Sequence, residues 1–343
     1  MTDSSIQTCY GAEVKTAPTV SIIIPAYNTA SLITEALDSV FGQTYKDFEA
    51  IVINDGSPDT EALERVLQPY LEQMVYIKQN NRGAAGARNT GIRQARGEYL
   101  AFLDSDEMWR PEFLASQMKL FDETPSLDMA YTDALFPTDS GRPAAETWMR
   151  SCPSKGPCTF ESLVKEDCHI PVSSVVVRKQ TIVEAGLFDE TLGCIDDYDM
   201  WLRVAYHGGK IAYQVVPLVY SRPERPGSLS QNTINTGKVL VKIFMKLGQA
   251  PMAASTRAAV RERLAQEQAL LHLTQAKFNL AAGDFAEAGE FLRKANSHLR
   301  SFKLRLVLAG LQVAPRFTRL GAEAWRGLLM TSHRLRASMI RPR

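Results

Sequence analysis

The sequence predicts an α/β fold with a mostly parallel central sheet flanked by helices, followed by an all-α extension. Strand and helix patterns alternate four times within about the first hundred residues, and each strand ends in polar residues. From about Asn232, Pro and Gly give way to Ala, Leu, Arg and Gln. Such alternation is typical of a parallel, doubly wound sheet. We expect a loose N-terminus over residues 1–17, an α/β domain over 18–231 and a helical extension over 232–343.

The composition is that of a globular protein in a reducing compartment. Of the 343 residues, 45% are apolar and 22% are charged, and the net charge of +1 gives no reason to expect nucleic-acid binding. Residues 1–18 hold no apolar run like that of a secretory signal, and no stretch reaches the roughly 20 apolar residues of a membrane span. The five cysteines are scattered and odd in number, so we expect a cytoplasmic protein without a disulfide framework. Zinc binding by Cys152, Cys158 and Cys168-His169 is an alternative, but the paired C-x-x-C spacing is missing.

The alternating region starts with a β-branched strand over 19–24 that Pro25 closes, followed by the turn 26–29. Further strands are predicted at 48–53, 75–77 and 99–103, and helices with an apolar stripe at 32–41 and 62–70. A Gly-rich turn at 80–86 leads into a further helix around 88–92. The polar residues after these strands are Tyr27, Asp55, Arg82, Asp104 and Asp106. Because the carboxyl ends of parallel strands share one edge of the sheet, these side chains should converge.

The fourth strand runs directly into the triplet Asp104-Ser105-Asp106. The preceding Leu100–Leu103 is apolar throughout, as in a strand buried on both faces. Two carboxylates one residue apart at a strand end can hold a hard cation such as Mg²⁺ or Mn²⁺. A turn followed by a helix N-cap is the alternative explanation of the triplet.

The middle of the chain is less regular. We expect a helix at 110–123 with Pro at its first turn, strands at 127–131, 171–178 and 211–220, and loops at 137–157 and 221–230. A helix that includes Met200, Trp201 and Val204 carries Asp196, Asp197 and Asp199 at its N-terminal end. Acidic residues stabilise a helix N-terminus, but three acids in four positions exceed what capping requires.

Two amphipathic helices, 261–279 and 285–298, follow in the extension, joined by residues 281–284. They are similar to one helix–turn–helix of tetratricopeptide type, with the expected roles taken by Ala276, Leu280, Gly283, Phe285, Ala288, Leu292 and Ala295. A single unit cannot bury a core alone, so it should dock on the α/β domain or on a partner.

The tail from Leu299 onward carries ten basic residues against one acid, Glu323, with apolar residues between them. This pattern predicts a segment that lies on an anionic membrane surface, peripherally on the inner face of the cell membrane. A solvated helix and a helix docked on the core are the alternatives.

Several motifs, in order, resemble glycosyltransferase family 2. They are Val20-Ser-Ile-Ile-Ile-Pro-Ala-Tyr-Asn28, Asn54-Asp-Gly-Ser57, Gly83 with Ala87-Arg-Asn89 and Gly91, Ala95 to Asp106, and Asp196-Asp197 with Trp201-Leu-Arg203. The resemblance spans about residues 18–230 and leaves out the helical extension. The resemblance implies the GT-A fold, which is Rossmann-like. It also implies inverting transfer of a sugar from a nucleotide-diphosphate donor, with UDP as the favoured nucleotide.

The resemblance also implies roles for individual residues. Donor binding falls to Pro25, Ala26, Tyr27, Asp55, Arg82, Asp104 and Ser105, with the Tyr27 ring against the base, Asp55 bonded to it and Asp104 at the ribose. Asp106, with Asp104, would bind a divalent metal, Mn²⁺ or Mg²⁺. Asp197 stands in the place of the general base, and Asp196 is the second candidate.

One departure concerns the loop after the last strand, where many relatives have a His near the metal. Residues 221–230 contain no His, but Arg222 and Arg225 suit a phosphate clamp.

The expected function is therefore metal-assisted transfer of a sugar to a hydroxyl of a glycan or lipid-linked acceptor, in the synthesis of a surface polysaccharide. A degenerate domain that serves as a partner-binding adaptor through its helical extension is the alternative. A dinucleotide-dependent oxidoreductase is disfavoured, because no G-x-G-x-x-G follows the first strand.

Overall fold

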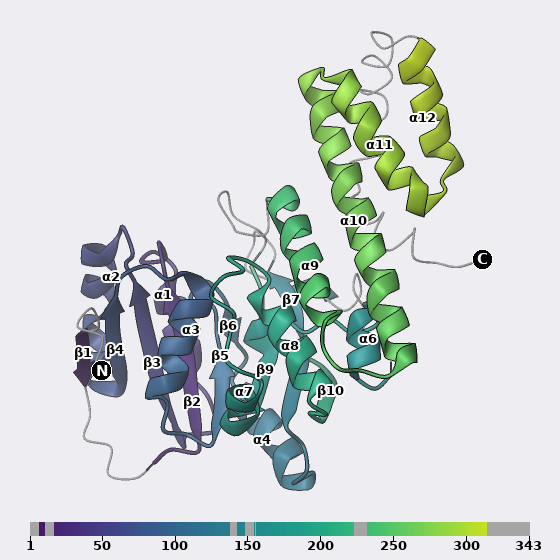
Figure 1. Ribbon diagram of the computed structural model, residues 1–343. Coiled ribbons are helices and arrows are strands. Elements are labelled where there is room, and N and C mark those ends of the chain that lie inside the picture. The colour runs from purple at the N-terminus through teal and green to yellow at the C-terminus, as the bar shows by residue number, and fades with distance from the viewer. Residues whose placement is uncertain are drawn as a thin grey trace. The chain divides into compact units, whose positions relative to one another are not determined.

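The computed structural model describes residues 7–10, 17–137, 143–147, 154, 156–222 and 232–313. These residues divide into two compact units, one over Met1–Gln231 and one over Asn232–Arg343. The first is an α/β unit and the second is helical (Figure 1), so the predicted fold class is confirmed. Among the described helices, none is both long enough and apolar enough to cross a membrane.

The α/β unit is built on one mixed sheet. Its strands, in sheet order, are β1 Gln7–Tyr10, β4 Met74–Gln79, β3 Phe48–Asp55, β2 Val20–Ala26, β5 Tyr99–Phe102, β9 Val175–Arg178, β7 Met129–Pro137, β10 Ile211–Tyr220 and β6 Met108–Trp109, with β8 Pro143–Thr147 paired to β7. The four strands β4, β3, β2 and β5 run parallel, as the alternation predicts. Beyond β5 the pairing is mixed, because β9 runs antiparallel to both β5 and β7.

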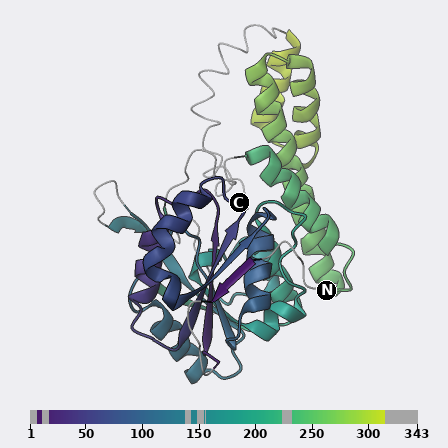
Figure 2. The same cartoon turned by 90° about the vertical axis from the view of Figure 1, so that its left-hand side faces the viewer.

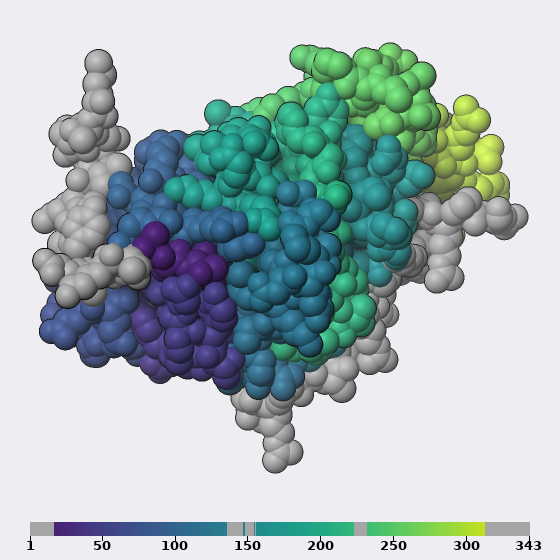
Figure 3. All heavy atoms as spheres, turned by 90° about the horizontal axis from the view of Figure 1, so that it is seen from below, coloured from purple at the N-terminus to yellow at the C-terminus, as the bar shows by residue number. Residues whose placement is uncertain are grey.

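Helices cover both faces of this sheet (Figure 2). They are α1 Ile33–Phe41, α2 Thr60–Leu67, α3 Gly83–Gln94, α4 Phe113–Glu123, α6 Phe160–Val164, α7 Lys179–Glu184 and α8 Asp196–Tyr206, with 3₁₀ turns η1 Gln68–Gln73 and η2 Val172–Ser174. Alternate strand residues face opposite sides: Ile22 and Ile24 pack in one core with Leu37 of α1 and Phe113 of α4, whereas Ile23 faces α3. Elements from β2 to β10 form one continuous body (Figure 3).

Three expectations for the α/β unit are wrong in detail. Residues 1–17 are expected to be loose, but Gln7–Tyr10 pair antiparallel with β4, since that edge strand offers unpaired backbone groups. Pro25 does not close the first strand, which continues to Ala26 beside Asn54. Helix α4 starts at Phe113 rather than at 110, because Met108–Trp109 pair with β10.

Close packing of α3 on the sheet depends on Gly91. A Cβ at this position would lie 2.6 Å from Ile23 Cγ2 and 3.0 Å from Ile53 Cδ1. We expect Gly91→Ala to lower the free energy of opening of α3 by about 1–3 kcal/mol, because the overpacking outweighs the better helix propensity of Ala.

The matched control for this substitution is Gly289→Ala in the helical unit. A Cβ there would meet only Arg293 Nη1, at 3.7 Å, so we expect no loss of stability. Hydrogen exchange measured on peptides from each region separates the two effects. Unchanged exchange of α3 in Gly91→Ala would contradict the packing argument.

The second unit contains α9 Thr233–Leu247, α10 Ala254–Ala282, α11 Phe285–Leu299 and α12 Phe302–Val313. The hairpin of α10 and α11 turns at Gly283, whose φ of 86° suits glycine, and Asp284 caps α11 by accepting a bond from the Glu287 N–H. Its buried core includes Ala276, Leu292 and Ala295 together with Leu304 and Leu311 of α12. The hairpin therefore has a core within its own unit, because α12 packs against it and completes that core.

This packing also shows where the first part of the basic tail lies. Residues 302–313 form a helix whose Leu304 and Leu311 are buried in this core, as one of the alternatives predicts. Residues 314–343 lie outside the described residues, so membrane contact stays a prediction for them.

Candidate active site

The loops that follow β2, β3 and β5 meet at one edge of the sheet. The Asn28 N–H donates to Ser57 Oγ (2.7 Å), and the Ser105 hydroxyl donates to Thr29 Oγ1 (3.0 Å). Each of these bonds joins loops from different strands. The structure thus brings together the polar strand ends that the parallel alternation predicts will converge.

The first part of this edge surrounds Asp55, which is 3% exposed. Asp55 Oδ1 accepts bonds from Gln79 Nε2 (2.6 Å) and from the Arg82 N–H (2.9 Å). Burial raises the pKa of Asp55, and these hydrogen bonds oppose the rise. On the neighbouring strand β2, the half-buried Pro25 and the buried Ala26 pair with Ile53 and Asn54, and the exposed Tyr27 follows them. An exposed flat ring and a buried acceptor at the ends of two adjacent strands suit a nucleobase.

Arg82 reaches Asp55 only through its backbone. Its guanidinium donates to both carboxylate oxygens of Glu190, with Nη2–Oε2 at 2.8 Å. Glu190 also accepts a bond from Asn89 Nδ2 (2.9 Å). Arg82 thus ties the start of α3 to the turn before α8, a contact that the sequence does not predict.

The second part of the edge is the turn Asp104–Glu107 after β5. Asp104 and Asp106 are half-buried, whereas Ser105 is buried with its hydroxyl bonded to Thr29. The Ser105 side chain therefore links this turn to the loop after β2. Glu107 is a further acid here, and the Ser221 hydroxyl donates to it. Burial and the charge of Asp104 raise the pKa of Glu107 to about 8.

Arg222 contacts the acidic turn and helix α1. Its Nε donates to the Asp106 carbonyl oxygen (2.8 Å), and its Nη2 pairs with Glu35 of α1 at 2.6 Å. It therefore lies beside the acidic turn, as a phosphate clamp would require. Arg225 lies outside the described residues.

Helix α8 brings Asp196 and Asp197 to the same region. The residue before it, Ile195, has φ 48° and ψ 29°, a left-handed conformation that is strained for a β-branched side chain by about 1–3 kcal/mol. Such strain persists only where the surrounding contacts fix the backbone. The start of α8 is therefore held in place and is not a relaxed helix cap.

The two adjacent acids of α8 have different surroundings. Asp196 is buried and paired with Arg88, whose Nη1 lies 2.7 Å from Asp196 Oδ2. Asp197 is half-buried and accepts a bond from the Tyr198 N–H (2.8 Å). Burial and the neighbouring Asp196 raise the pKa of Asp197 to about 7, while Arg88 opposes the rise. A carboxylate with this pKa suits a general base near neutral pH.

Arg88 is the residue that the sequence analysis misses. It joins Asp196 to Asp104, with Nη2–Asp104 Oδ1 at 2.8 Å. Burial alone would lower the pKa of Arg88, but Asp196 and Asp104 outweigh it and keep the guanidinium charged. The available signal in the sequence was its place in the motif Ala87-Arg-Asn89. In the structure Ala85 to Ile92 are all buried, so a charged residue there requires buried partners.

The acidic turn fits a divalent cation of the Mg²⁺ or Mn²⁺ type. Such ions take one or two carboxylates and fill their other positions with water and phosphate oxygens. Asp104 and Asp106 would supply the carboxylates. Within the described ranges, no group of three or more His, Cys, Asp or Glu residues is placed to hold a metal. The zinc alternative gains no support from them either: Cys158 and Cys168 are buried free thiols that share a hydrogen bond, and Cys152 lies outside the described residues.

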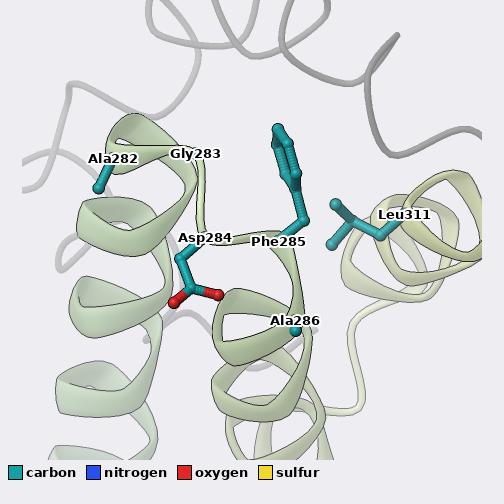
Figure 4. Close-up of a pocket in the computed structure, with 6 residues that line it drawn as sticks. All are labelled: Ala282, Gly283, Asp284, Phe285, Ala286 and Leu311. Atoms are coloured by element: carbon teal, nitrogen blue, oxygen red, sulfur yellow. The ribbon is translucent and has the colours of Figure 1, made fainter.

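A separate hollow lies in the helical unit, at the turn between α10 and α11 (Figure 4). Leu311 of α12 lies beside Phe285 of α11, and Asp284 is the one charged residue among the six that line the hollow. It carries none of the predicted site residues.

Comparison with known proteins gives the family. Residues 21–152 match the family described as "Glycosyl transferase family 2". A protein of Escherichia coli named UDP-Glc:alpha-D-GlcNAc-diphosphoundecaprenol beta-1,3-glucosyltransferase WfaP is 32% identical over 234 residues, which cover 66% of this chain and 87% of that protein. An "Uncharacterized glycosyltransferase" of Rickettsia bellii is 30% identical over 60% of this chain and 30% of its own length. Across five such Rickettsia proteins, the chain spans between 30% and 58% of the relative's length.

Solved structures share the fold. S. aureus TarS 1-349 in complex with UDP-GlcNAc superposes with a TM-score of 0.61 at 18% identity, covering 90% of this chain and 92% of that one. The mannosyltransferase PcManGT from Pyrobaculum calidifontis, in complex with GDP-Man and Mn2+, gives a TM-score of 0.58 at 21% identity over 93% and 89% of the two chains. The GT-A fold is thus confirmed, and the chain belongs to glycosyl transferase family 2.

Proposed function

We propose that the chain is an inverting glycosyltransferase that moves a sugar from a UDP-sugar to a hydroxyl of a lipid-linked glycan, in the synthesis of a surface polysaccharide. The observation that carries the proposal is the opposition of two acidic groups across Arg88. Asp104 and Asp106 stand at the end of β5, and Asp196 and Asp197 at the start of α8. One group suits the donor diphosphate and the other suits the attacking acceptor.

The donor would lie along the edge from β3 to β5. The base would rest on Tyr27 and be bonded by Asp55, with Pro25 and Ala26 lining the pocket. Asp106, with Asp104, would hold the divalent cation, which neutralises the charge that develops on the leaving diphosphate. Arg222 lies beside the same turn and would contact the phosphates; the same role is proposed for Arg225.

Asp197 would take the proton from the acceptor hydroxyl as that oxygen attacks the anomeric carbon. Because this single displacement occurs on the face opposite the leaving diphosphate, the configuration inverts. Asp197 is favoured over Asp196 because a carboxylate paired with a buried guanidinium accepts a proton less readily.

The proposal of a uridine donor and a lipid-linked acceptor is based on the names and ligands of similar proteins. The Escherichia coli relative is named for UDP-Glc and a diphosphoundecaprenol acceptor, and TarS was crystallised with UDP-GlcNAc. The GDP-Man complex of PcManGT makes guanosine the competing base.

A donor screen tests the proposal. Purified protein is incubated with Mn²⁺ or Mg²⁺ and UDP-, GDP- or dTDP-sugars, with nucleotide release and thermal shift as readouts. We expect metal-dependent stabilisation and nucleotide release with one UDP-sugar. No response to any donor would contradict the proposal and favour a partner-binding adaptor that displays the helical unit.

A further inference from the structure

We propose that Arg88 is a positioning residue for sugar transfer, which holds the acidic turn of the donor side and the start of the base-carrying helix at a fixed separation. The inference rests on the proposed function, because it assigns Asp104 to the donor side and Asp197 to the acceptor side. Arg88 itself need not contact either substrate. It would act through Asp104 and Asp196.

Arg88 forms ion pairs with carboxylates on two different elements, so it bridges them. Its two terminal nitrogens bind carboxylates from two different elements, Asp104 after β5 at 2.8 Å and Asp196 of α8 at 2.7 Å. The Arg88 side chain is 6% exposed, and its guanidinium carbon lies 5.6 Å from the centre of the Phe188 ring. The planar guanidinium holds its donors in fixed directions, so one side chain can bond carboxylates on two elements at the same time.

The backbone of α3 that carries Arg88 is itself fixed. Arg88 stands on α3, three residues before Gly91, where the helix lies too close to Ile23 for a Cβ. Asn89, the next residue, exchanges two bonds with the backbone of Phe188 at 2.9 Å each. The helix therefore cannot shift to compensate for a shortened side chain at position 88.

The backbone on the α8 side of the bridge is strained. Asp196 directly follows Ile195, whose left-handed backbone requires external contacts to persist. The ion pair of Arg88 with Asp196 is such a contact, and it lies one residue from Asp197. Loss of the pair should release the first turn of α8 and displace the proposed base.

The main test uses Arg88→Lys, which keeps the charge but loses the fork. We expect kcat, measured as nucleotide release from the donor sugar that the wild-type protein turns over, to fall about 10- to 100-fold, because misplacement by about 1 Å costs that much. Asp196→Asn breaks only the α8 side, so it should lower kcat while the affinity for UDP with Mn²⁺, measured by calorimetry, stays within twofold. The double variant should lose little more kcat than Arg88→Lys alone, because both changes break the same contact.

Arg96→Lys is the matched control. Arg96 binds the buried Glu49 through Nε (2.9 Å) and Nη2 (2.6 Å), but this pair lies near the start of β3, at the opposite edge of the sheet. Arg96→Lys therefore shows how much kcat changes when an arginine–carboxylate pair is altered away from the proposed site. We expect kcat of Arg96→Lys to match that of the wild type.

A measurement on the protein without donor or metal separates this inference from the proposed function. Hydrogen exchange of peptides covering residues 190–206 should be faster in Arg88→Lys than in the wild type and in Arg96→Lys. Failure of the wild type to turn over any donor would overturn the function, and this comparison would still test the bridge. Equal exchange, a kcat loss no larger than that of Arg96→Lys, or a loss in Asp196→Asn equal to that in Asp197→Asn would each overturn the positioning role.

Discussion

Asp197→Asn is expected to lower the rate of sugar transfer by about 10²- to 10⁴-fold, because asparagine cannot take the proton of the acceptor hydroxyl. The substitution keeps the size of the side chain and its ability to accept the bond from the Tyr198 N–H. The affinity for UDP with Mn²⁺ should therefore stay within about twofold of wild type. Initial rates of nucleotide release and calorimetry measure the two effects. Asp122→Asn, at an exposed carboxylate on α4, is the control.

The pH dependence of the wild type gives an independent check on the same residue. The pKa of Asp197 is raised to about 7 by burial and by Asp196, with Asp104 acting in the same direction and Arg88 against it. A base must be unprotonated, so kcat should rise with pH through about 7 and level off above it. For an ordinary Asp, whose pKa is about 3.9, the rise would be complete below pH 6. A rate that does not change between pH 5.5 and 7 would rule out this base.

Asp106→Ala should abolish the dependence of donor binding on Mn²⁺ or Mg²⁺ and lower kcat/KM by about 10²- to 10³-fold. Asp106 is half-buried at the end of β5, and Asp104, the other carboxylate of the turn, already carries the ion pair with Arg88. Asp104 alone would therefore hold the cation poorly. Calorimetric titration of UDP with and without metal measures the effect.

The fold should survive this change, since the turn keeps its main anchors. The Ser105–Thr29 bond involves a neighbouring side chain, and Arg222 bonds the backbone carbonyl of Asp106, which alanine retains. Thermal denaturation of Asp106→Ala without ligand should match that of the wild type. Metal-dependent UDP binding of wild-type strength in Asp106→Ala would show that the cation lies elsewhere.

Local patterns in the sequence predict the first half of the sheet and its functional edge. Strands β2 to β5 and the helices between them follow from β-branched runs and apolar stripes, because these patterns report which faces of an element are buried. The polar residues Asp55, Asp104 and Asp106 stand at strand ends, and parallel order alone makes strand ends converge. The hairpin of α10 and α11 follows in the same way from its helical periodicity and Gly283.

Contacts between distant segments could not be predicted. Arg88 is joined to Asp104 across 16 positions and to Asp196 across 108, and Arg82 to Glu190 across 108. No periodicity encodes such pairs, since they depend on how α3, β5 and α8 are placed by the whole sheet. The mixed order beyond β5 and the pairing of β1 also depend on which strand edges are left open.

The sequence by itself therefore determined the class of fold, the acids at the strand ends and the division at about residue 232. Tertiary structure decided which of the two adjacent acids of α8 is paired. Asp196 and Asp197 are indistinguishable as letters, but the backbone at Ile195 turns one towards Arg88 and leaves the other half-buried with a raised pKa. The pKa and the availability of a carboxylate are set by the charges and the burial around it, and these exist only once the chain has folded.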